Sequence, residues 1–511
     1  MNMKKSKSSV KAVMMLFFLT IVTKIVGFLK TSITAASFGV SIETDIYNLA
    51  DGVVNQIFSS FSAAIVVIIL PIYLAQKHKN ENEGKIFARS SYYSLALFSI
   101  FLVGILYFLN PYIVDIMGYS YNAEYKELFV NYLQILELGI SFSIITGALQ
   151  AILNAEKIYG FPSICAMVNS FIVILLILLF KNTIGLWAIV IASPIAYIAQ
   201  IIILRYKTNK YLSAKVNDIS FDQNIKKLFT KMFPLFIGNA TLEINSFIDK
   251  YFLSGIKGGV LSSVSYANTI LVFATNIIML PLSTVLFTDI STLRINGETD
   301  KIKKIVKNTL LGVIAISLPI TLVFVICSEQ IISILFGYGK FNETAIKLTS
   351  SALSIYGITI VFHIIKYVLN RVLYAFLDTK TPMKIGIFTV LIHIFLVTIL
   401  AKKYGMQGIL ISNVLDVIIS TTLTYLIISK NYFNLQLWKD FGILFSLLLA
   451  FSVSAISIIT IKYFINVNVF INFILYSLTG LIVYLLIIIF FQRKFVFTMM
   501  NNLKNMRKKD N

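Results

Sequence analysis

Two lysines lie inside one long apolar segment near the N-terminus. Lys24 and Lys30 flank Gly27, and at about 100° per residue the three positions spread over one side of a helix. A charged side chain at the bilayer centre costs at least about 2.5–3.5 kcal/mol on insertion scales, so such residues face protein or water. We therefore take both lysines as candidates for a hydrated, substrate-binding surface.

A stripe of carboxylate and amide side chains follows in the second apolar segment. Its members recur at three- and four-residue steps, which places them on one helical face: Asp45, Asn48, Asp51 and Asn55. Two later segments add mixed charges, namely Glu243 and Lys250 in the seventh and Lys366 and Arg371 in the tenth. Mixed lysines and carboxylates suit a large anionic, polar headgroup better than a small inorganic ion.

For any one of these residues, the alternative is a structural pair across helices or a side chain that snorkels to the interface. As a set they predict a cavity, because polar residues concentrate in segments 1, 2, 7 and 10, whereas segments 3, 5, 13 and 14 are almost purely apolar. Asn245 and Asp249 of the seventh segment are also a possible coordinating pair for a coupling ion. Their spacing does not choose Na⁺ over H⁺.

These residues are carried by about fourteen apolar segments, each long enough for the roughly 20 residues that a spanning helix needs. The chain has 511 residues and is 58% hydrophobic, with a mean hydropathy of +0.84. The pattern predicts an all-α polytopic membrane protein and excludes a soluble multidomain protein and a β-barrel, whose strands alternate polar and apolar residues. The segments are expected to begin near Val10, Asp45, Ser91, Leu128, Ser163, Leu186, Phe233, Ser262, Asn308, Leu348, Met383, Met406, Gly442 and Phe470.

Membrane topology explains the net charge of +21. Loops after even-numbered segments are basic and the opposite loops are nearly bare, which is the positive-inside pattern. We therefore expect both termini in the cytoplasm and no nucleic-acid partner. No small-residue cleavage site follows the first segment, so we interpret it as a retained helix. Cys165 and Cys327 lie in apolar stretches, which implies buried thiols and no metal site.

The chain divides into two related halves. At a constant offset of 220 residues, Leu153 matches Leu373, and the same holds for Ala155 with Ala375, Pro162 with Pro382 and Gly185 with Gly405. Each half holds an even number of segments, which implies parallel repeats around a cavity. The expected division is an N-terminal lobe (1–206), a basic cytoplasmic linker (207–231), a C-terminal lobe (232–430), a terminal helix pair (431–497) and a basic tail (498–511).

Four stretches, in order, resemble a known family. They are Thr23–Lys30, followed by Phe38-Gly39 and Thr44-Asp45; Asn245–Asp249, followed by Ser265–Asn268; Leu335–Phe341; and Tyr374–Pro382. They are similar to motifs of the MurJ (MviN) lipid II flippases of the MOP exporter superfamily. The resemblance implies two six-helix lobes and a terminal pair. It also implies a transporter, with no catalytic residues, that moves undecaprenyl-pyrophosphate-linked peptidoglycan precursor to the outer leaflet of the bacterial plasma membrane by alternating access.

The resemblance places the family's cavity cations at Lys24 and Lys30 and its acid at Asp45, but the sequence departs from the family pattern. Lysine keeps the charge of arginine without its bidentate geometry. Thr31 replaces the acid after the second cation, and the arginines expected at Thr269 and near Gln56 are missing. Lys250, Lys366 and Arg371 are candidates to compensate.

These departures leave other cargoes open. The alternatives are a flippase for another lipid-linked oligosaccharide, of a capsule or exopolysaccharide, and a small-molecule exporter of the same superfamily. A membrane-embedded glycosyltransferase or acyltransferase needs catalytic carboxylates or histidines near a leaflet, and the three histidines give it little support. The expected partners are the lipid-linked glycan, the bilayer and a peptidoglycan or polysaccharide polymerase. No cofactor is expected beyond a coupling ion, Na⁺ or H⁺.

Overall fold

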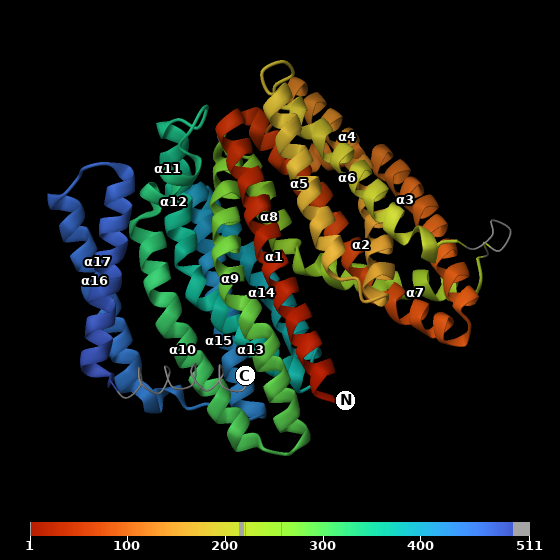
Figure 1. Cartoon of the computed structure of the whole chain (residues 1–511). Coiled ribbons are helices and arrows are strands. Elements are labelled where there is room, and N and C mark those ends of the chain that lie inside the picture. The colour runs from red at the N-terminus through yellow and green to blue at the C-terminus, as the bar shows by residue number, and fades with distance from the viewer. Residues whose placement is uncertain (1, 214–218, 220, 257, 494–511) are drawn as a thin grey trace. The chain divides into compact units, whose positions relative to one another are not determined.

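The computed structural model describes residues 2–213, 219, 221–256 and 258–493, and over these residues the ordered elements are all helices (Figure 1). The first helices are α1 (Asn2–Phe38), α2 (Ile42–Lys79), α3 (Glu81–Met117), α4 (Ala123–Ala155), α5 (Gly160–Phe180), α6 (Trp187–Thr208), the 3₁₀ turn η1 (Asn209–Tyr211), α7 (Gln223–Leu242) and α8 (Ile244–Ser254). The later ones are α9 (Val260–Ile295), α10 (Thr299–Ile326), α11 (Ser328–Phe336), α12 (Glu343–Gly357), α13 (Thr359–Ala375), α14 (Lys380–Tyr404), α15 (Met406–Asn431), the 3₁₀ turn η3 (Leu437–Asp440), α16 (Phe441–Phe464) and α17 (Val469–Phe491).

Polar residues in the short loops set where several helices begin. Ser41 caps α2 through a capping box with Thr44, in which each side chain bonds the other residue's backbone N–H. Asn122, Asn342 and Asn468 each accept a hydrogen bond from the backbone N–H three residues on, at the starts of α4, α12 and α17. A small amide or hydroxyl side chain in the loop satisfies the free N–H groups of each first turn.

The all-helical membrane fold is confirmed. Among the described residues, twelve helices are long and apolar enough to cross a membrane, and α12 with α13, bent by 42° at their junction, together have the length and composition of a further span. The seventh predicted segment consists of α7 and α8, which are separated at Glu243. The short helix α11 was not predicted. Each of the fourteen expected segments therefore has a helix or helix pair in the structure.

The helices form two compact units. The first comprises residues 1–262 with 339–341, and the second comprises residues 263–338 with 342–511. In the first unit α4 packs against α2, α3 and α6, and α7 packs against α2 and α3. The predicted lobe boundaries stay a prediction. The tail at 498–511 and residues 214–218 and 220 of the predicted linker lie outside the described residues.

The terminal helix pair packs onto the second unit. Figure 1 shows α16 and α17 side by side in blue. Tyr484 of α17 is buried with Leu318 of α10, Val361 of α13 and Leu447 of α16. Its hydroxyl donates to the Ala315 carbonyl at 2.9 Å. Burial of this aromatic side chain, with its hydroxyl paired, ties the pair to the unit.

The internal repeat is visible in the backbone of two turns. Lys157, after α4, and Leu377, after α13, both have φ = 61°, a left-handed conformation that is uncommon outside glycine. The hydrogen bonds around them match at the same offset of 220 residues: Ile158 N to Leu153 O at 2.8 Å, and Asp378 N to Leu373 O at 2.9 Å. This is the pattern of the Schellman motif. The related halves inferred from the sequence thus share a helix ending in atomic detail.

Candidate functional site

Asp45, in the first turn of α2, is buried and holds the segment that starts α9. Its Oδ2 accepts from Gly259 N at 2.5 Å, and its Oδ1 accepts from Ser262 N at 2.6 Å and from Ser262 Oγ at 2.5 Å. A carboxylate at free N–H groups in a helix's first turn is favoured by the helix dipole. The acid expected in a cavity is therefore fully engaged by protein donors.

Asn48, one turn later on α2, also contacts the start of α9. Its Nδ2 donates to the Thr44 carbonyl at 2.8 Å and to Ser262 Oγ at 3.3 Å. Ser262 Oγ also lies 3.1 Å from Thr44 Oγ1. The N-terminal end of the polar stripe, formed by Asp45 and Asn48, thus binds Gly259 and Ser262 of the same unit.

Further along α2, around Asp51 and Gly52, the stripe faces α8. The ammonium group of Lys250 occupies the space that a side chain at Gly52 would fill. The carboxylates of Asp51, Glu243 and Asp249 all interact electrostatically with Lys250. Here the structure brings four of the residues singled out in the sequence within electrostatic range of one another, one cation and three carboxylates.

A second contact between α2 and α8 lies at Gln56, near the position where the resemblance led us to expect an arginine. Gln56 Nε2 donates to Ser246 Oγ at 2.6 Å, which joins α2 to α8 with a neutral pair. Asn55, its neighbour, is exposed. A neutral hydrogen bond therefore lies close to where the resemblance led us to expect an arginine.

The two predicted cavity cations, Lys24 and Lys30, lie on α1. Lys24 is exposed and Lys30 is half-buried. Among the described residues, neither ammonium forms a salt bridge. Anion binding by these two cations stays a prediction.

The second unit carries its own buried charges on α13 and α15. Lys366 interacts electrostatically with Asp416, which is 6% exposed, and with His363. Arg371 donates from Nη2 to Tyr367 OH at 2.9 Å, and its guanidinium lies 4.7 Å from the centroid of that ring. Asp416 is thus a counter-charge for Lys366, whereas Arg371 is held by an aromatic neighbour one turn away.

The two candidate ligands of a coupling ion, Asn245 and Asp249, lie one turn apart on α8, and both are half-buried. Over the described ranges, no group of three or more histidine, cysteine or carboxylate side chains could hold a metal ion. Coordination of an ion by these two residues stays a prediction.

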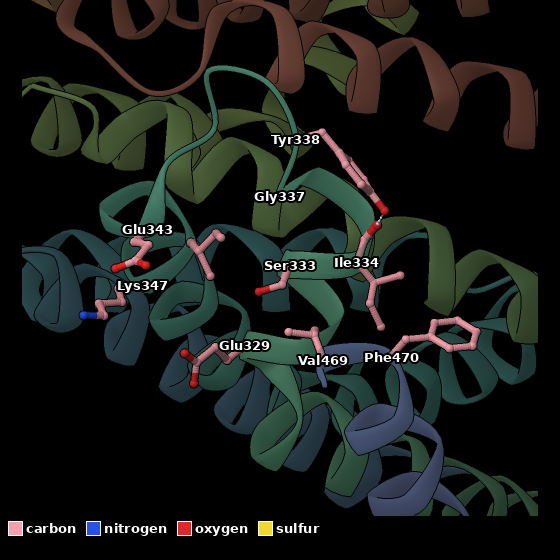
Figure 2. Close-up of a pocket in the computed structure, with 10 residues that line it drawn as sticks. Glu329, Ser333, Ile334, Gly337, Tyr338, Glu343, Lys347, Val469 and Phe470 are labelled. Carbon is pink, nitrogen blue, oxygen red and sulfur yellow. Dashed lines mark hydrogen bonds between the residues drawn. The ribbon is translucent and has the colours of Figure 1, made fainter. Parts of the chain in front are cut away.

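Figure 2 shows a pocket of about 560 Å³ in the second unit that the sequence did not single out. Its wall includes Glu329 of α11, Glu343 and Lys347 of α12, and Phe470 of α17. Tyr338 lies at its edge, and its hydroxyl donates to the Ile334 carbonyl at 2.7 Å. Residues near helix ends line this pocket, and none of the predicted cavity residues is among them.

Sequence analysis missed the partners of the predicted residues more than the residues themselves. Ser262, Ser246 and Gly259 bind or abut the stripe, but a serine or glycine in a loop or apolar helix has no distinctive pattern. Gly52 was visible as a small residue between polar ones. Only its distance from Lys250 reveals why a side chain is excluded there.

Comparison with known proteins places the chain among transporters. The family model described as "Lipid II flippase MurJ" matches residues 34–500. A probable lipid II flippase MurJ of Buchnera aphidicola subsp. Schizaphis graminum is 27% identical over 478 residues, 91% of each chain. A solved lipid II flippase MurJ in an inward closed conformation is similar with a TM-score of 0.77 and 23% identity, covering 94% of this chain and all of the other. An inward-facing MATE family multidrug transporter of the MOP superfamily shares the fold more loosely, with a TM-score of 0.63, 15% identity, and 80% and 96% coverage.

Proposed function

The chain belongs to the lipid II flippase MurJ family, and on that premise we propose that it moves lipid II from the cytoplasmic to the outer leaflet of the bacterial plasma membrane. The observation that carries the proposal is the family match over residues 34–500, which takes in nearly all of the spanning helices. A membrane transporter fits the multi-span helical fold.

The physical task is to move a charged pyrophosphate-linked glycan past hydrocarbon while its prenyl tail stays in the bilayer. Desolvating a charge without a partner is costly, so the path needs cations that are free to pair with it. Lys24 and Lys30 meet that need, because neither is committed to a carboxylate among the described residues. We assign them to the pyrophosphate.

Lys250 plays a different part in this proposal. Three carboxylates, those of Asp51, Glu243 and Asp249, already act on it. A cation so compensated binds an additional anion weakly, and it suits release of the headgroup better than capture. Lys366, compensated by Asp416, has the same character in the second unit.

The transport cycle is proposed to be alternating access, driven by the membrane potential or by a gradient of Na⁺ or H⁺. Asn245 and Asp249 are the candidate ion ligands. The basic even-numbered loops support cytoplasmic termini. A polymerase that consumes the lipid-linked precursor at the outer leaflet is the expected partner.

A second cargo is favoured by one specific observation. Both cations of α1 are lysines, which bind phosphate as point charges without the fork geometry of arginine. Such a site holds the pyrophosphate less selectively, which suits a flippase for another lipid-linked oligosaccharide. The pyrophosphate chemistry is shared, and only the glycan differs.

The deciding experiment is complementation of a conditional lipid II flippase depletion strain, with outer-leaflet lipid II measured by an external probe. Restored growth with lipid II at the outer leaflet supports the proposal. Protein that reaches the membrane while lipid II stays inside overturns the peptidoglycan cargo in favour of another lipid-linked glycan. Efflux of cationic dyes without lipid II movement points to a small-molecule exporter.

Alanine variants test the residue assignment in the same strain. Lys24→Ala and Lys30→Ala are expected to abolish complementation at unchanged membrane levels. Lys402→Ala is the matched control, since Lys402 is an exposed lysine in the last turn of α14. Normal growth of both α1 variants would remove these lysines from the pathway.

A further inference from the structure

A carboxylate lies deep inside the first unit, away from the polar stripe. Glu137, in the middle of α4, is 2% exposed, and Asn110 of α3 is 0% exposed. Asn110 Nδ2 donates to Glu137 Oε2 at 3.1 Å. The two side chains thus form an isolated polar pair between two helices that pack together.

The surroundings of this pair offer little to compensate a negative charge. Glu137 lies among apolar neighbours on α4, including Leu133, Leu136 and Ile140, all buried. Charged groups on the helices packed against α4 lie mostly in terminal turns. They are Glu43, Asp45, Asp51, Lys77, His78 and Lys79 on α2; Glu81, Glu83, Lys85, Arg89 and Asp115 on α3; Arg205 and Lys207 on α6; and, on α4 itself, Glu124, Lys126 and Glu127. The buried tyrosines on these helices are Tyr47, Tyr73 and Tyr132.

Two charges in that set, Asp51 of α2 and Arg89 of α3, lie more than two turns from a helix end. Arg89 comes 21 residues before Asn110 on the same helix, which is roughly 30 Å along its axis, and Asp51 is itself negative. A carboxylate stripped of water and without a cation is strongly disfavoured in its ionised form. Neutralisation by a proton removes that cost, because a neutral acid needs only hydrogen bonds.

The side-chain oxygen of Asn110 supports the same conclusion. Asn110 Oδ1 is buried and has no hydrogen-bond partner among the described residues. An ionised carboxylate is an acceptor only, so it cannot satisfy this oxygen. A protonated carboxyl group has one O–H donor and can donate it to Asn110 Oδ1, while still accepting from Asn110 Nδ2. The acid and the amide then satisfy each other through two reciprocal hydrogen bonds.

From this geometry we propose that Glu137 and Asn110 form a proton-binding site of the first unit, in which a neutral carboxylic acid and the amide are joined as a two-bond ring. The proton occupies the carboxyl oxygen nearer to Asn110 Oδ1. The pair then adds no charge to the bilayer interior and joins α3 to α4. This proposal is independent of the cargo, because it concerns the resting state of one unit.

The test uses the purified full-length chain in detergent and compares conservative with disruptive variants. Glu137→Gln preserves both hydrogen bonds without a proton, since its amide N–H donates to Asn110 Oδ1 and its oxygen accepts from Asn110 Nδ2. It is expected to unfold at the wild-type temperature at neutral pH. Glu137→Ala leaves both Asn110 groups unpaired and is expected to unfold at a clearly lower temperature. A Glu137→Gln protein that unfolds as early as Glu137→Ala would overturn the neutral pair.

Infrared spectroscopy reads the proton directly, without reference to stability. At neutral pH the wild-type protein is expected to show the C=O stretching band of a protonated carboxylic acid, and this band is absent from Glu137→Gln. Asp51→Asn serves as the control carboxylate variant and keeps the band. In Asn110→Ala the band persists and moves to higher frequency, because the acid loses its ring partner. Identical wild-type and Glu137→Gln spectra in this region would exclude the proposed site.

Discussion

Asp45 accepts hydrogen bonds from both the backbone N–H and the hydroxyl of Ser262, 217 residues away in the chain. A third bond comes from Gly259 N. All three donors converge on one buried carboxylate, so Asp45 makes more of the hydrogen bonds from α2 to the start of α9 than Asn48 and Thr44, which contact only the Ser262 hydroxyl.

Replacing Asp45 with alanine is expected to lower the free energy of unfolding by about 2–3 kcal/mol, since the two N–H groups lose a charged acceptor. Thermal unfolding of the purified protein measures the loss. Glu43→Gln is the control, because Glu43 is exposed in the same turn of α2. Equal unfolding temperatures for Asp45→Ala and the wild type would show that the hydrogen bonds of Asp45 with Gly259 and Ser262 do not stabilise the fold.

Adding a methyl group at Gly52 is expected to displace Lys250. The new Cβ would overlap the Lys250 ammonium group, which lies at the end of a flexible side chain and can move. Gly52→Ala should therefore reduce complementation as Lys250→Ala does, with little change in unfolding temperature. Gly104→Ala in α3 is the matched control, because nothing lies within 4 Å of a Cβ there. Full activity of Gly52→Ala would mean that the position of Lys250 is irrelevant to transport.

Arginine at the α1 cation positions is expected to be tolerated. Lys24→Arg and Lys30→Arg keep the charge and add a bidentate fork for a pyrophosphate. Both variants should support growth in the depletion strain, in contrast to the alanine variants. Outer-leaflet lipid II, quantified beside growth, distinguishes better binding from faster turnover. Failure of both arginine variants would indicate that these positions are limited by space instead of charge.

Acid is expected to loosen the loop between α13 and α14. Burial acts to raise the pKa of Asp378, but hydrogen bonds from Thr381, Tyr432 and Lys380 outweigh it, and the pKa lies below its usual value. Burial, with the hydrogen bond to Asp378 and its charge, raises the pKa of Tyr432 to about 12, so the phenol remains a donor.

A carboxylate whose pKa is depressed by folding stabilises the protein above its unfolded pKa, about 3.9, and loses that contribution as the pH falls through the folded value. The unfolding temperature of the wild type should therefore drop more steeply below about pH 4 than that of Asp378→Asn. Tyr432→Phe should reduce the difference in part. Parallel curves for wild type and Asp378→Asn would refute the linkage.

The membrane fold could be predicted because hydropathy is a local property of each segment. The predicted starts at Ser262, Met406 and Phe470 lie within two residues of the observed starts of α9, α15 and α17. The break at Glu243 could not be predicted, since neither proline nor glycine marks it in the sequence, and both α7 and α8 pack against α2 and α3. The short helix α11 was missed because nine residues between two longer segments carry too little periodicity.

The candidate site was predictable in residue type and not in pairing. Asp45 was identified as a functional acid, yet its partners are mostly backbone N–H groups, which every residue possesses. The charges around Lys250 were each named, but their convergence depends on how α8 faces α2. Long-range contacts of this kind follow from three-dimensional packing and leave no mark in the spacing of one segment.

The matching turns at Lys157 and Leu377 show that two different sequences can form the same helix ending. Their hydrogen bonds are made by main-chain atoms, so the shape survives while the side chains diverge. Ile158 in one turn and Asp378 in the other occupy equivalent positions. Of these two residues, only Asp378 accepts a hydrogen bond from the Tyr432 hydroxyl. The same main-chain turn therefore serves as a plain helix ending in one place and as a mount for a pH-sensitive acid in the other.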